Sequence, residues 1–316
     1  MINLVTGGAG FIGSHICERL LNNGHEVICL DNFYPYYDPS LKRKNIEPYL
    51  YNKNFKLIEG SILDKELLND IIQDVDYIFH EAAQAGVRTS VKNPIKTNEV
   101  NVKGTMNILT ASLDSNVKKI IFASSSSVYG KKEYLPFDEK HPTNPISPYG
   151  ISKLAAEHYC RVFYELYGLG TTSLRYFTVY GPRMRPDLAI SIFTRYALQN
   201  KPIKIFGYGN KTRDFTYIDN AIEANMLVMK KGNGEVYNIG SGNRISINEL
   251  AEKIIQITNS NSKIIHTKSQ KGDVEHTWAD VSKARDELGY TPKIDLDEGL
   301  RNYVEWNKSV SSNSRL

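Results

Sequence analysis

The chain has 316 residues, of which 41% are hydrophobic and 23% are charged, as is ordinary for a globular enzyme of one large or two smaller domains. Its 39 basic and 35 acidic residues give a formal net charge of +4 and are spread along the chain, so we expect no nucleic-acid partner. No apolar run approaches the ~18 residues of a membrane span, the first expected strand starts at residue 2, and the three cysteines lack metal-ligand spacing. We therefore expect a cytoplasmic protein without membrane contact, signal peptide or metal site.

The first expected element is a strand at residues 2–5, which breaks into a glycine-rich turn followed by a helix over residues 14–23. Glycines stand at Gly7, Gly10 and Gly13, in the spacing G-x-x-G-x-x-G. A side chain at such a turn would keep the backbone away from a pyrophosphate, while the N-terminus of the helix offers free N–H groups to that anion. The pattern therefore predicts a dinucleotide-binding turn.

The second expected strand, residues 26–30, ends in Asp31. A carboxylate roughly 20 residues after the glycines fits the acid that hydrogen-bonds the ribose diol of adenosine. Its negative charge repels a 2′-phosphate, so the sequence favours NAD over NADP. A glycine turn without a ligand is the alternative, but strand, helix and acid occur here together.

Strands and helices alternate through the rest of the first half. We expect a helix from residue 40, a strand at 55–60, a helix at 63–74, a strand at 76–80, a helix at 98–115 and a strand at 119–123. This alternation predicts an α/β fold with a Rossmann-type doubly wound parallel sheet and ligands at the carboxyl ends of the strands. Ala82 and Ala83 follow the fourth strand, where small side chains let a ligand come close. We interpret the basic run at residues 42–44 as a solvated helix face.

The second half is less regular. Beyond the proline-rich stretch at 142–148 we expect helices at 149–167, 191–198 and 247–258, strands at 172–177, 203–206 and 236–239, two short helices within 280–306 and a frayed end from Val310. We divide the chain into an NAD-binding domain, residues 1–175, and a smaller α/β substrate-binding region, residues 176–316. Some of the later chain is expected to return to the first domain.

Tyr149 and Lys153 stand four residues apart, so an expected helix presents both on one face. A nearby positive charge favours the phenolate, which would make Tyr149 a usable base near neutral pH. Ser125, at the end of a strand upstream, is the candidate hydroxyl that relays or orients the substrate proton. The alternatives are a structural Tyr–Lys pair and a serine-rich turn that caps the strand.

These motifs resemble the extended short-chain dehydrogenase/reductases, and within them the nucleotide-sugar 4-epimerases. The resemblance covers nearly the whole chain, through the stretches 6–13, 31–32, 80–83, 101–105, 124–130, 149–153, 175–183, 213–217 and 272–284. Segments 31–43 and 180–189 most closely resemble UDP-glucuronate 4-epimerases.

The resemblance implies bound NAD, a UDP-sugar substrate and a homodimer formed through the helices at 98–115 and 149–167. The implied NAD contacts are Gly7, Gly10, Phe11, Ile12, Gly13, Asp31, Asn32, Ser61, Ile62, Ala82, Ala83, Asn101, Tyr149, Lys153 and Tyr176. The implied substrate contacts are Arg88, Ser126, Ser127, Thr178, Arg185, Arg213 and Thr277. Two positions depart from the family: Ser61 replaces the usual Asp beside the adenine, and Gln270, next to Lys271, replaces a basic residue.

The reaction type is predicted from acids that the chain lacks. Related dehydratases carry Asp-Glu, and related decarboxylases carry Glu, immediately before Val128-Tyr129-Gly130, where this chain has Ser126 and Ser127. Without these acids, the simplest outcome of oxidising C4 is return of the hydride to its other face. The sequence therefore predicts C4 epimerisation, with a UDP-glucuronate decarboxylase and a non-catalytic NAD-binding regulator as weaker alternatives. An NAD that is reoxidised within each turnover should stay bound.

The substrate is predicted from two positions. Arg185 offers a bidentate contact to a C6 carboxylate, which favours interconversion of UDP-glucuronate and UDP-galacturonate. Arg88 is a second, weaker candidate for that contact. Thr277 stands where a large Tyr would exclude a C2 N-acetyl group, so UDP-glucose/UDP-galactose and the UDP-N-acetylhexosamine pair remain alternatives.

Overall fold

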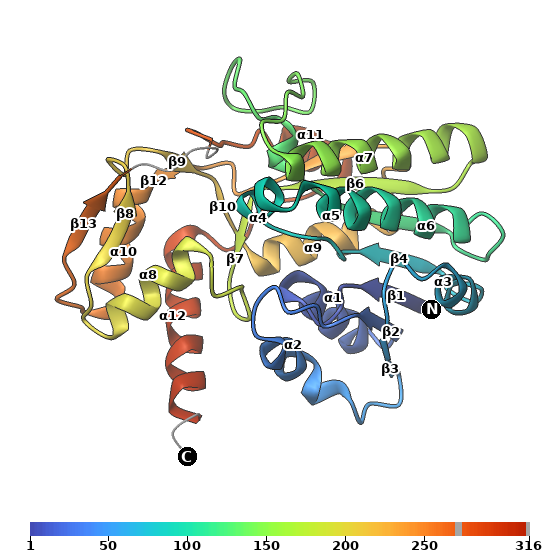
Figure 1. The fold of residues 1–316 in the computed structure, drawn as a ribbon, viewed down its shortest axis with the longest axis horizontal. Coiled ribbons are helices and arrows are strands. Elements are labelled where there is room, and N and C mark those ends of the chain that lie inside the picture. The colour runs from blue at the N-terminus through green and yellow to red at the C-terminus, as the bar shows by residue number, and fades with distance from the viewer. Residues whose placement is uncertain (269–273, 314–316) are drawn as a thin grey trace.

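The computed structural model describes residues 1–268 and 274–313, and a parallel sheet of seven strands lies at its centre (Figure 1). Its strands are β1 (Ile2–Thr6), β2 (Glu26–Asp31), β3 (Phe55–Glu59), β4 (Tyr77–His80), β5 (Lys119–Ser125), β6 (Thr171–Tyr176) and β11 (Val236–Ile239). They follow the order β11-β6-β5-β4-β1-β2-β3, and every neighbouring pair is parallel. The predicted Rossmann-type α/β fold is confirmed.

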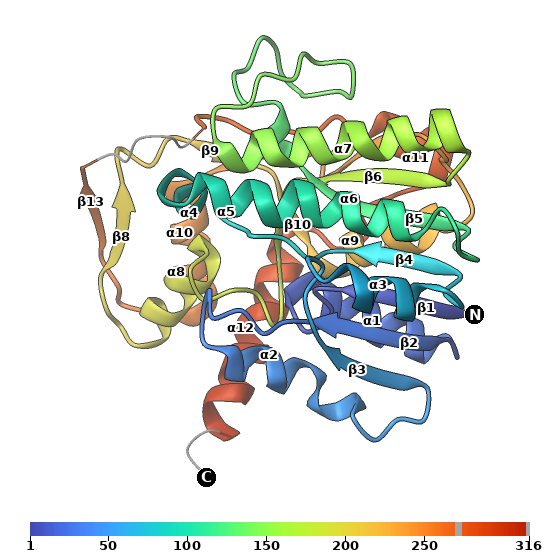
Figure 2. The same ribbon diagram turned by 45° about the vertical axis from the view of Figure 1, so that its right-hand side comes forward.

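Helices cover both faces of this sheet (Figures 1 and 2). One face carries α3 (Lys65–Ile72), α6 (Gly104–Ala111) and α7 (Pro148–Tyr167), and the other carries α1 (Phe11–Asn22), α9 (Ile218–Val228) and α11 (Ser282–Leu288). Successive residues of β5 pack into the hydrophobic cores on opposite faces of the sheet, because side chains along a strand alternate between its faces. Ile120 and Phe122 pack under α6 and α7, while Ile121 and Ala123 pack on the α1 side. Burial on both faces explains the nearly continuous apolar runs of these strands.

The expected long helix at 98–115 is interrupted. Its residues form the end of α5 (Pro94–Asn98), one π-helical turn at Glu99–Lys103, and α6. Such a turn inserts an extra residue and redirects side chains, often near functional sites. Here it turns Asn101 inward, where only 2% of the residue is exposed.

The second half builds a smaller region beside the sheet. It contains α8 (Ala189–Leu198), α10 (Ile247–Thr258), α12 (Leu296–Asn313) and the paired strands β7 (Thr178–Tyr180) with β10 (Phe215–Tyr217), β9 (Thr212–Arg213) with β12 (Ile245–Ser246), and β8 (Ile203–Phe206) with β13 (Ile264–Thr267). The last helix buries a stripe formed by Leu300, Tyr303 and Val304. It continues to Asn313, so the expected helix end at Trp306 and the expected fraying from Val310 are wrong for residues 307–313.

The chain does not stay in that region. After β10, α9 packs against α1, and β11 then pairs with β6 at the edge of the central sheet. Arg19 of α1 bridges to Glu223 of α9 at 3.2 Å. The domain boundary at residue 175 stays a prediction. Strand β6 crosses this position, and β11, which comes from beyond it, completes the central sheet.

The remaining elements are short: α2 (Pro39–Ile46), α4 (Val87–Lys92) and the 3₁₀ turns Glu47–Tyr49 and Ser126–Val128. None of the helices within residues 1–268 and 274–313 combines the length and apolar character needed to cross a membrane.

Candidate active site

A cavity of about 730 Å³ opens at the carboxyl ends of β1, β2, β4, β5 and β6, where the parallel-sheet pattern predicts a ligand. Of the predicted site residues, the following line it: Gly7, Gly10, Phe11, Ile12, Gly13, Asp31, Asn32, Ser61, Ile62, Ala82, Ala83, Ser125, Ser126, Ser127, Tyr149, Lys153, Tyr176, Thr178, Arg185, Arg213 and Thr277. Two predicted residues, Arg88 and Asn101, are not part of its lining.

The glycine turn is tightly packed between α1 and the segment after β4. Gly7 has φ +66°, and a Cβ built there would lie 2.8 Å from the backbone nitrogen of Ala82. A Cβ on Gly13 would lie 2.3 Å from the carbonyl oxygen of Gly7. No side chain caps α1 at Gly10, so its first N–H groups remain available to an anion in the cavity.

Asp31 is the last residue of β2, and only one of its two carboxylate oxygens has hydrogen-bond partners among the described residues. Its Oδ1 accepts hydrogen bonds from the Phe33 backbone at 2.8 Å and from Lys42 Nζ at 3.0 Å. Its Oδ2 is buried and has no hydrogen-bond partner among the described residues. The expectation of a solvated face at residues 42–44 is therefore wrong for Lys42, which lies against Asp31 and lines the cavity, and right for the exposed Arg43, which pairs with Glu59.

Tyr149 and Lys153 lie in the first turns of α7, which Ser147 caps and Pro148 begins. Lys153 is 3% exposed and donates to the Ala123 carbonyl at 2.7 Å. This bond ties the lysine to β5, whose last residue is Ser125.

The electrostatics of Tyr149 differ from the sequence expectation. Burial raises the pKa of the Tyr149 phenol, while the charge of Arg185 and a hydrogen bond with Ser125 lower it. Burial also lowers the pKa of Lys153 to about 8, against the opposing attraction of Glu81. The cation that most favours a Tyr149 phenolate is thus Arg185, and sequence spacing alone could not identify it.

Glu81 is a cavity residue that the sequence reasoning missed. It follows β4 directly, and Tyr176 Oη donates to its Oε1 at 3.1 Å. Burial raises the pKa of Glu81 to about 7, and the Lys153 charge opposes that rise. Its position at the end of a central strand, immediately before Ala82 and Ala83, was the available signal.

Asn101 supports the cavity from behind. Its Oδ1 accepts from the Gln84 backbone at 2.7 Å, and its Nδ2 donates to Ser152 Oγ at 2.9 Å. These bonds fix the segment after β4 against α7. The cofactor contact at Asn101 stays a prediction. The side-chain amide supports the cavity wall, because the π-helical turn points it into the protein.

The substrate contact at Arg88 also stays a prediction. Its guanidinium lies 5.4 Å from the centre of the Phe206 ring, so α4 contacts β8 through a cation–π pair. Arg185 keeps its place in the cavity, but Nε and Nη2 are 3.0 and 3.2 Å from the two oxygens of Asp187. Tyr36 Oη donates to the same carboxylate at 3.1 Å.

Arg213 marks the other end of the cavity. Its guanidinium donates to the backbone carbonyls of Val274 at 2.6 Å and Glu275 at 3.1 Å. Thr277 lies nearby and accepts a hydrogen bond from the Asp214 backbone at 3.2 Å. Gln270 and Lys271, singled out as a departure from the family, lie outside the described residues.

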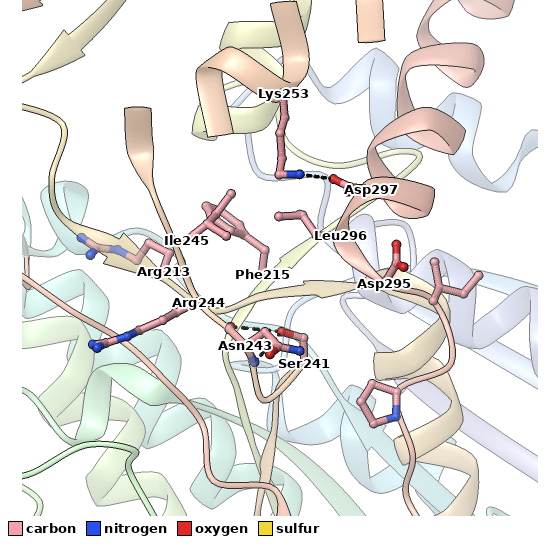
Figure 3. A pocket seen from close by; sticks show the side chains of 12 residues that line it. Arg213, Phe215, Ser241, Asn243, Arg244, Ile245, Lys253, Asp295, Leu296 and Asp297 are labelled. Carbon is pink, nitrogen blue, oxygen red and sulfur yellow. Dashed lines mark hydrogen bonds and ion pairs between the residues drawn. The ribbon is translucent and has the colours of Figure 1, made fainter. Parts of the chain in front are cut away.

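A second, smaller cavity of about 290 Å³ shares Arg213 with the first (Figure 3). Figure 3 shows Lys253 of α10 reaching Asp297 of α12 across it, at 2.6 Å. Its lining contains none of Ser125, Tyr149 and Lys153. The larger cavity is therefore the candidate active site. Within the described parts of the chain, no group of three or more His, Cys, Asp or Glu side chains is arranged to hold a metal ion.

Comparisons with known proteins give a consistent picture. Residues 4–303 match the sequence profile of the family described as GDP-mannose 4,6 dehydratase. A UDP-glucuronate 4-epimerase of Thermodesulfobacterium geofontis is 39% identical over 308 residues, which cover 96% of this chain and 95% of that protein. Two crystal structures superpose with a TM-score of 0.93 at 39% identity, each over 98% of this chain and 100% of the other. They are the Thermotoga maritima UDP-glucose 4-epimerase with UDP-glucose and the Bacillus cereus UDP-glucuronic acid 4-epimerase with UDP-glucuronic acid and NAD.

Proposed function

The chain belongs to the GDP-mannose 4,6-dehydratase family of extended short-chain dehydrogenases/reductases, and from this premise we propose that it interconverts UDP-glucuronate and UDP-galacturonate by epimerisation at C4. It is an NAD-dependent isomerase of the UDP-sugar 4-epimerase class. The observation that carries the reaction type is the pair Ser126 and Ser127, which line the cavity where related dehydratases and decarboxylases have carboxylic acids.

The cavity fits NAD on its own geometry. The buried Oδ2 of Asp31 has no hydrogen-bond partner among the described residues and could accept a hydrogen bond from a ribose hydroxyl. The N–H groups at the uncapped N-terminus of α1 could bind a pyrophosphate. Gly7 and Gly13 leave no space for side chains between that turn and its neighbours. When bound, NAD supplies a hydride acceptor for sugar C4 that gives the hydride back within the same turnover.

The chain's own groups handle the proton. We propose that Tyr149 takes the proton of the sugar 4-hydroxyl as the base and later returns it. Ser125 is hydrogen-bonded with the Tyr149 phenol and orients it, and the Arg185 charge lowers the pKa of that phenol. Lys153, held at the Ala123 carbonyl, is the second cation that we propose for this group. Because burial raises the pKa of free Tyr149, the phenol depends on nearby cations to lose its proton.

A uronate substrate adds a requirement that the proposed Arg185 contact meets. The 4-keto intermediate of UDP-glucuronate is a β-keto acid, which loses CO₂ when the breaking C5–C bond stands perpendicular to the keto plane. A fixed bidentate partner holds the carboxylate away from that geometry. Ser126, Ser127 and Thr178 add hydroxyl groups in the same cavity.

One observation favours a second candidate, the neutral pair UDP-glucose and UDP-galactose. Arg185 already has an anionic partner in Asp187, so a sugar carboxylate must share the guanidinium or displace that partner. The small Thr277 also leaves the UDP-N-acetylhexosamine pair open.

The deciding experiment is NMR of the products that the purified enzyme forms from UDP-glucuronate, UDP-glucose and UDP-N-acetylglucosamine. We expect UDP-galacturonate to form fastest, with no CO₂ and no net NADH, and no turnover by the Y149F control. Formation of a 4-keto-6-deoxy sugar or a pentose would overturn the reaction type, and faster turnover of a neutral sugar would overturn the substrate.

We further propose a homodimer through the helices at 98–115 and 149–167, which correspond to the end of α5, the π-helical turn, α6 and α7. Ile95 of α5 and Ile151 and Leu166 of α7 are 84%, 56% and 69% exposed. Burial of such apolar side chains between two subunits would favour association. Light scattering should give twice the chain mass, and I151E/L166E should give the monomer mass. A monomeric wild type would contradict this proposal.

A further inference from the structure

Glu81 places a carboxylate in the cavity wall, and a short chain of hydrogen bonds fixes its direction. Tyr176 Oη donates to Glu81 Oε1 at 3.1 Å, and Asn225 Nδ2 donates to Tyr176 Oη at 2.7 Å. Asn225 belongs to α9, which packs beneath β6. The carboxylate is thus anchored by a strand and a helix that are both distinct from β4, which it follows.

The charged and titratable groups that face Glu81 come from three elements. Lys153 and Tyr149 of α7 interact with its charge, Tyr176 of β6 donates to it, and His80 precedes it on β4. Burial and the Lys153 charge lower the pKa of His80 to about 3, so His80 stays neutral at physiological pH. The Glu81 carboxylate raises the pKa of both Lys153 and Tyr149.

The nicotinamide end of NAD must lie near these groups. A hydride acceptor has to reach the sugar C4 whose hydroxyl Tyr149 binds, while Asp31 holds the adenosine end of the cavity. The oxidised nicotinamide ring carries a positive charge and the reduced ring carries none. A carboxylate at the Tyr149 end therefore stabilises the oxidised form more than the reduced form.

We propose that Glu81 is a positioning residue that sets the balance between oxidised and reduced nicotinamide, by holding a negative charge at the reactive end of the cavity. This inference rests on the NAD-dependent reaction proposed above and goes beyond it, because it assigns a role to an acid outside the Ser125–Tyr149–Lys153 group. The ionised Glu81 carboxylate would favour the oxidised cofactor and therefore the return of the hydride to the sugar. The protonated carboxyl lacks this charge, so it would no longer disfavour the reduced cofactor that holds the hydride.

The pH range of this effect follows from burial. Since desolvation raises the pKa of Glu81 to about 7, its charge changes within the range where the enzyme can be studied. The Tyr176 hydrogen bond lowers the pKa of Glu81, so removing it should move the change to higher pH.

The test uses the holoenzyme without any UDP-sugar. Cyanoborohydride transfers a hydride, with its electron pair, to the bound oxidised nicotinamide and is itself oxidised, and the absorbance of the reduced ring reports the rate. We would follow this rate from about pH 5.5 to about pH 8.5 and divide it by the rate for free NAD at each pH. Wild type should become about tenfold faster (~1.4 kcal/mol) as pH falls through the titration of Glu81.

The variants give distinct outcomes. E81Q should react at the fast, low-pH rate throughout, Y176F should show the wild-type change at higher pH, and E165Q should behave as wild type. Glu165 is the control because it is an acid of α7 that lies outside the cavity lining and pairs with Arg161, at 2.7 Å. Parallel profiles for E81Q and wild type would overturn the inference, and so would a Y176F change at the wild-type pH. Neither outcome depends on which sugar is turned over, so the proposed reaction is tested separately.

Discussion

The guanidinium of Arg185 is bound by both carboxylate oxygens of Asp187, with Nε 3.0 Å from Oδ1 and Nη2 3.2 Å from Oδ2. Tyr36 donates to the same carboxylate and places its ring 5.2 Å from the guanidinium carbon. Asp187 therefore competes with a substrate carboxylate for the Arg185 guanidinium. The relative strength of these two contacts should determine how strongly the enzyme prefers a uronate substrate.

Replacing Arg185 should separate uronate from neutral substrates. A hydrogen bond to a charged group contributes about 1.5–3 kcal/mol, so R185A should lower kcat/KM for UDP-glucuronate by roughly 10- to 100-fold. The loss for UDP-glucose should be smaller, because R185A there removes only the cation that favours the Tyr149 phenolate. D187N is the matched variant: it keeps the shape, removes the competing charge, and should raise the preference for the uronate severalfold. Equal losses on both substrates in R185A would contradict the carboxylate contact.

Replacing Asp31 should relax the choice between NAD and NADP. Lys42 Nζ lies 3.0 Å from Asp31 Oδ1, so D31S removes the repulsive acid and frees a cation for a 2′-phosphate. We expect the dissociation constant for NADPH to fall by about tenfold or more in a fluorescence titration, while that for NADH rises. The D31S/K42A double variant should lose the gain for NADPH. Unchanged NADPH affinity in D31S would show that Lys42 does not reach the phosphate.

His80 should make the protein sensitive to acid. It is fully buried between Thr6 Oγ1 at 2.8 Å and Thr105 Oγ1 at 2.9 Å, and its pKa is lowered to about 3. The unfolded chain binds this proton near pH 6.5, so the contribution is complete above that pH and is lost as pH falls toward 3. The free energy of unfolding should drop by about 2 kcal/mol between about pH 6.5 and about pH 5.

Urea unfolding of wild type and H80N at these two pH values checks this prediction. H80N should have a lower free energy of unfolding at neutral pH than wild type, and this free energy should change less between the two pH values. The comparison is needed because Asp214 acts in the opposite sense: burial raises its pKa to about 6, so its ionisation costs stability as pH rises from about 4. Identical slopes for the two proteins would contradict the assignment to His80.

The ion pair beneath the strand ends should be costly to break. Arg175 Nη2 lies 2.6 Å from Glu157 Oε1, both side chains are nearly inaccessible, and Ser124 Oγ donates to Glu157 Oε2 at 2.6 Å. Removing one partner leaves an uncompensated buried charge, so R175M should lower the free energy of unfolding by about 3–5 kcal/mol. The R175M/E157L double variant should lose less than R175M alone. A larger loss in the double variant would contradict this explanation.

The sequence predicted the parts of the fold that depend on local pattern. Alternating apolar runs and amphipathic helices identified six strands of the central sheet in order, and Val236–Ile239 as a later strand. The sequence did not predict α9, nor the short strands β7, β9, β10, β12 and β13. These strands are two to four residues long, which is too short to show an alternation of apolar and polar residues. They form because a partner strand lies beside them.

The site shows the same division. Residue types at strand ends predicted the glycine turn, Asp31, Ala82, Ala83 and Ser125 as lining residues, because parallel strands bring their carboxyl ends together. The family resemblance supplied most of the other predicted lining residues. The contacts of Arg88 with Phe206 and of Asn101 with Gln84 could not be predicted, because these partners come from other elements. The pKa of Tyr149 could not be anticipated either, since it depends on burial and on Arg185, which is remote in sequence.

The return of β11 to the edge of the central sheet also affects how the protein is made. The ribosome must release the chain through Ile239 before β6 receives its outer neighbour, although β6 itself ends at Tyr176. Until then the nascent sheet presents an unpaired edge that other strands can join. A fragment that stops at Gly234 should therefore self-associate in sedimentation experiments, while the full chain keeps that edge covered.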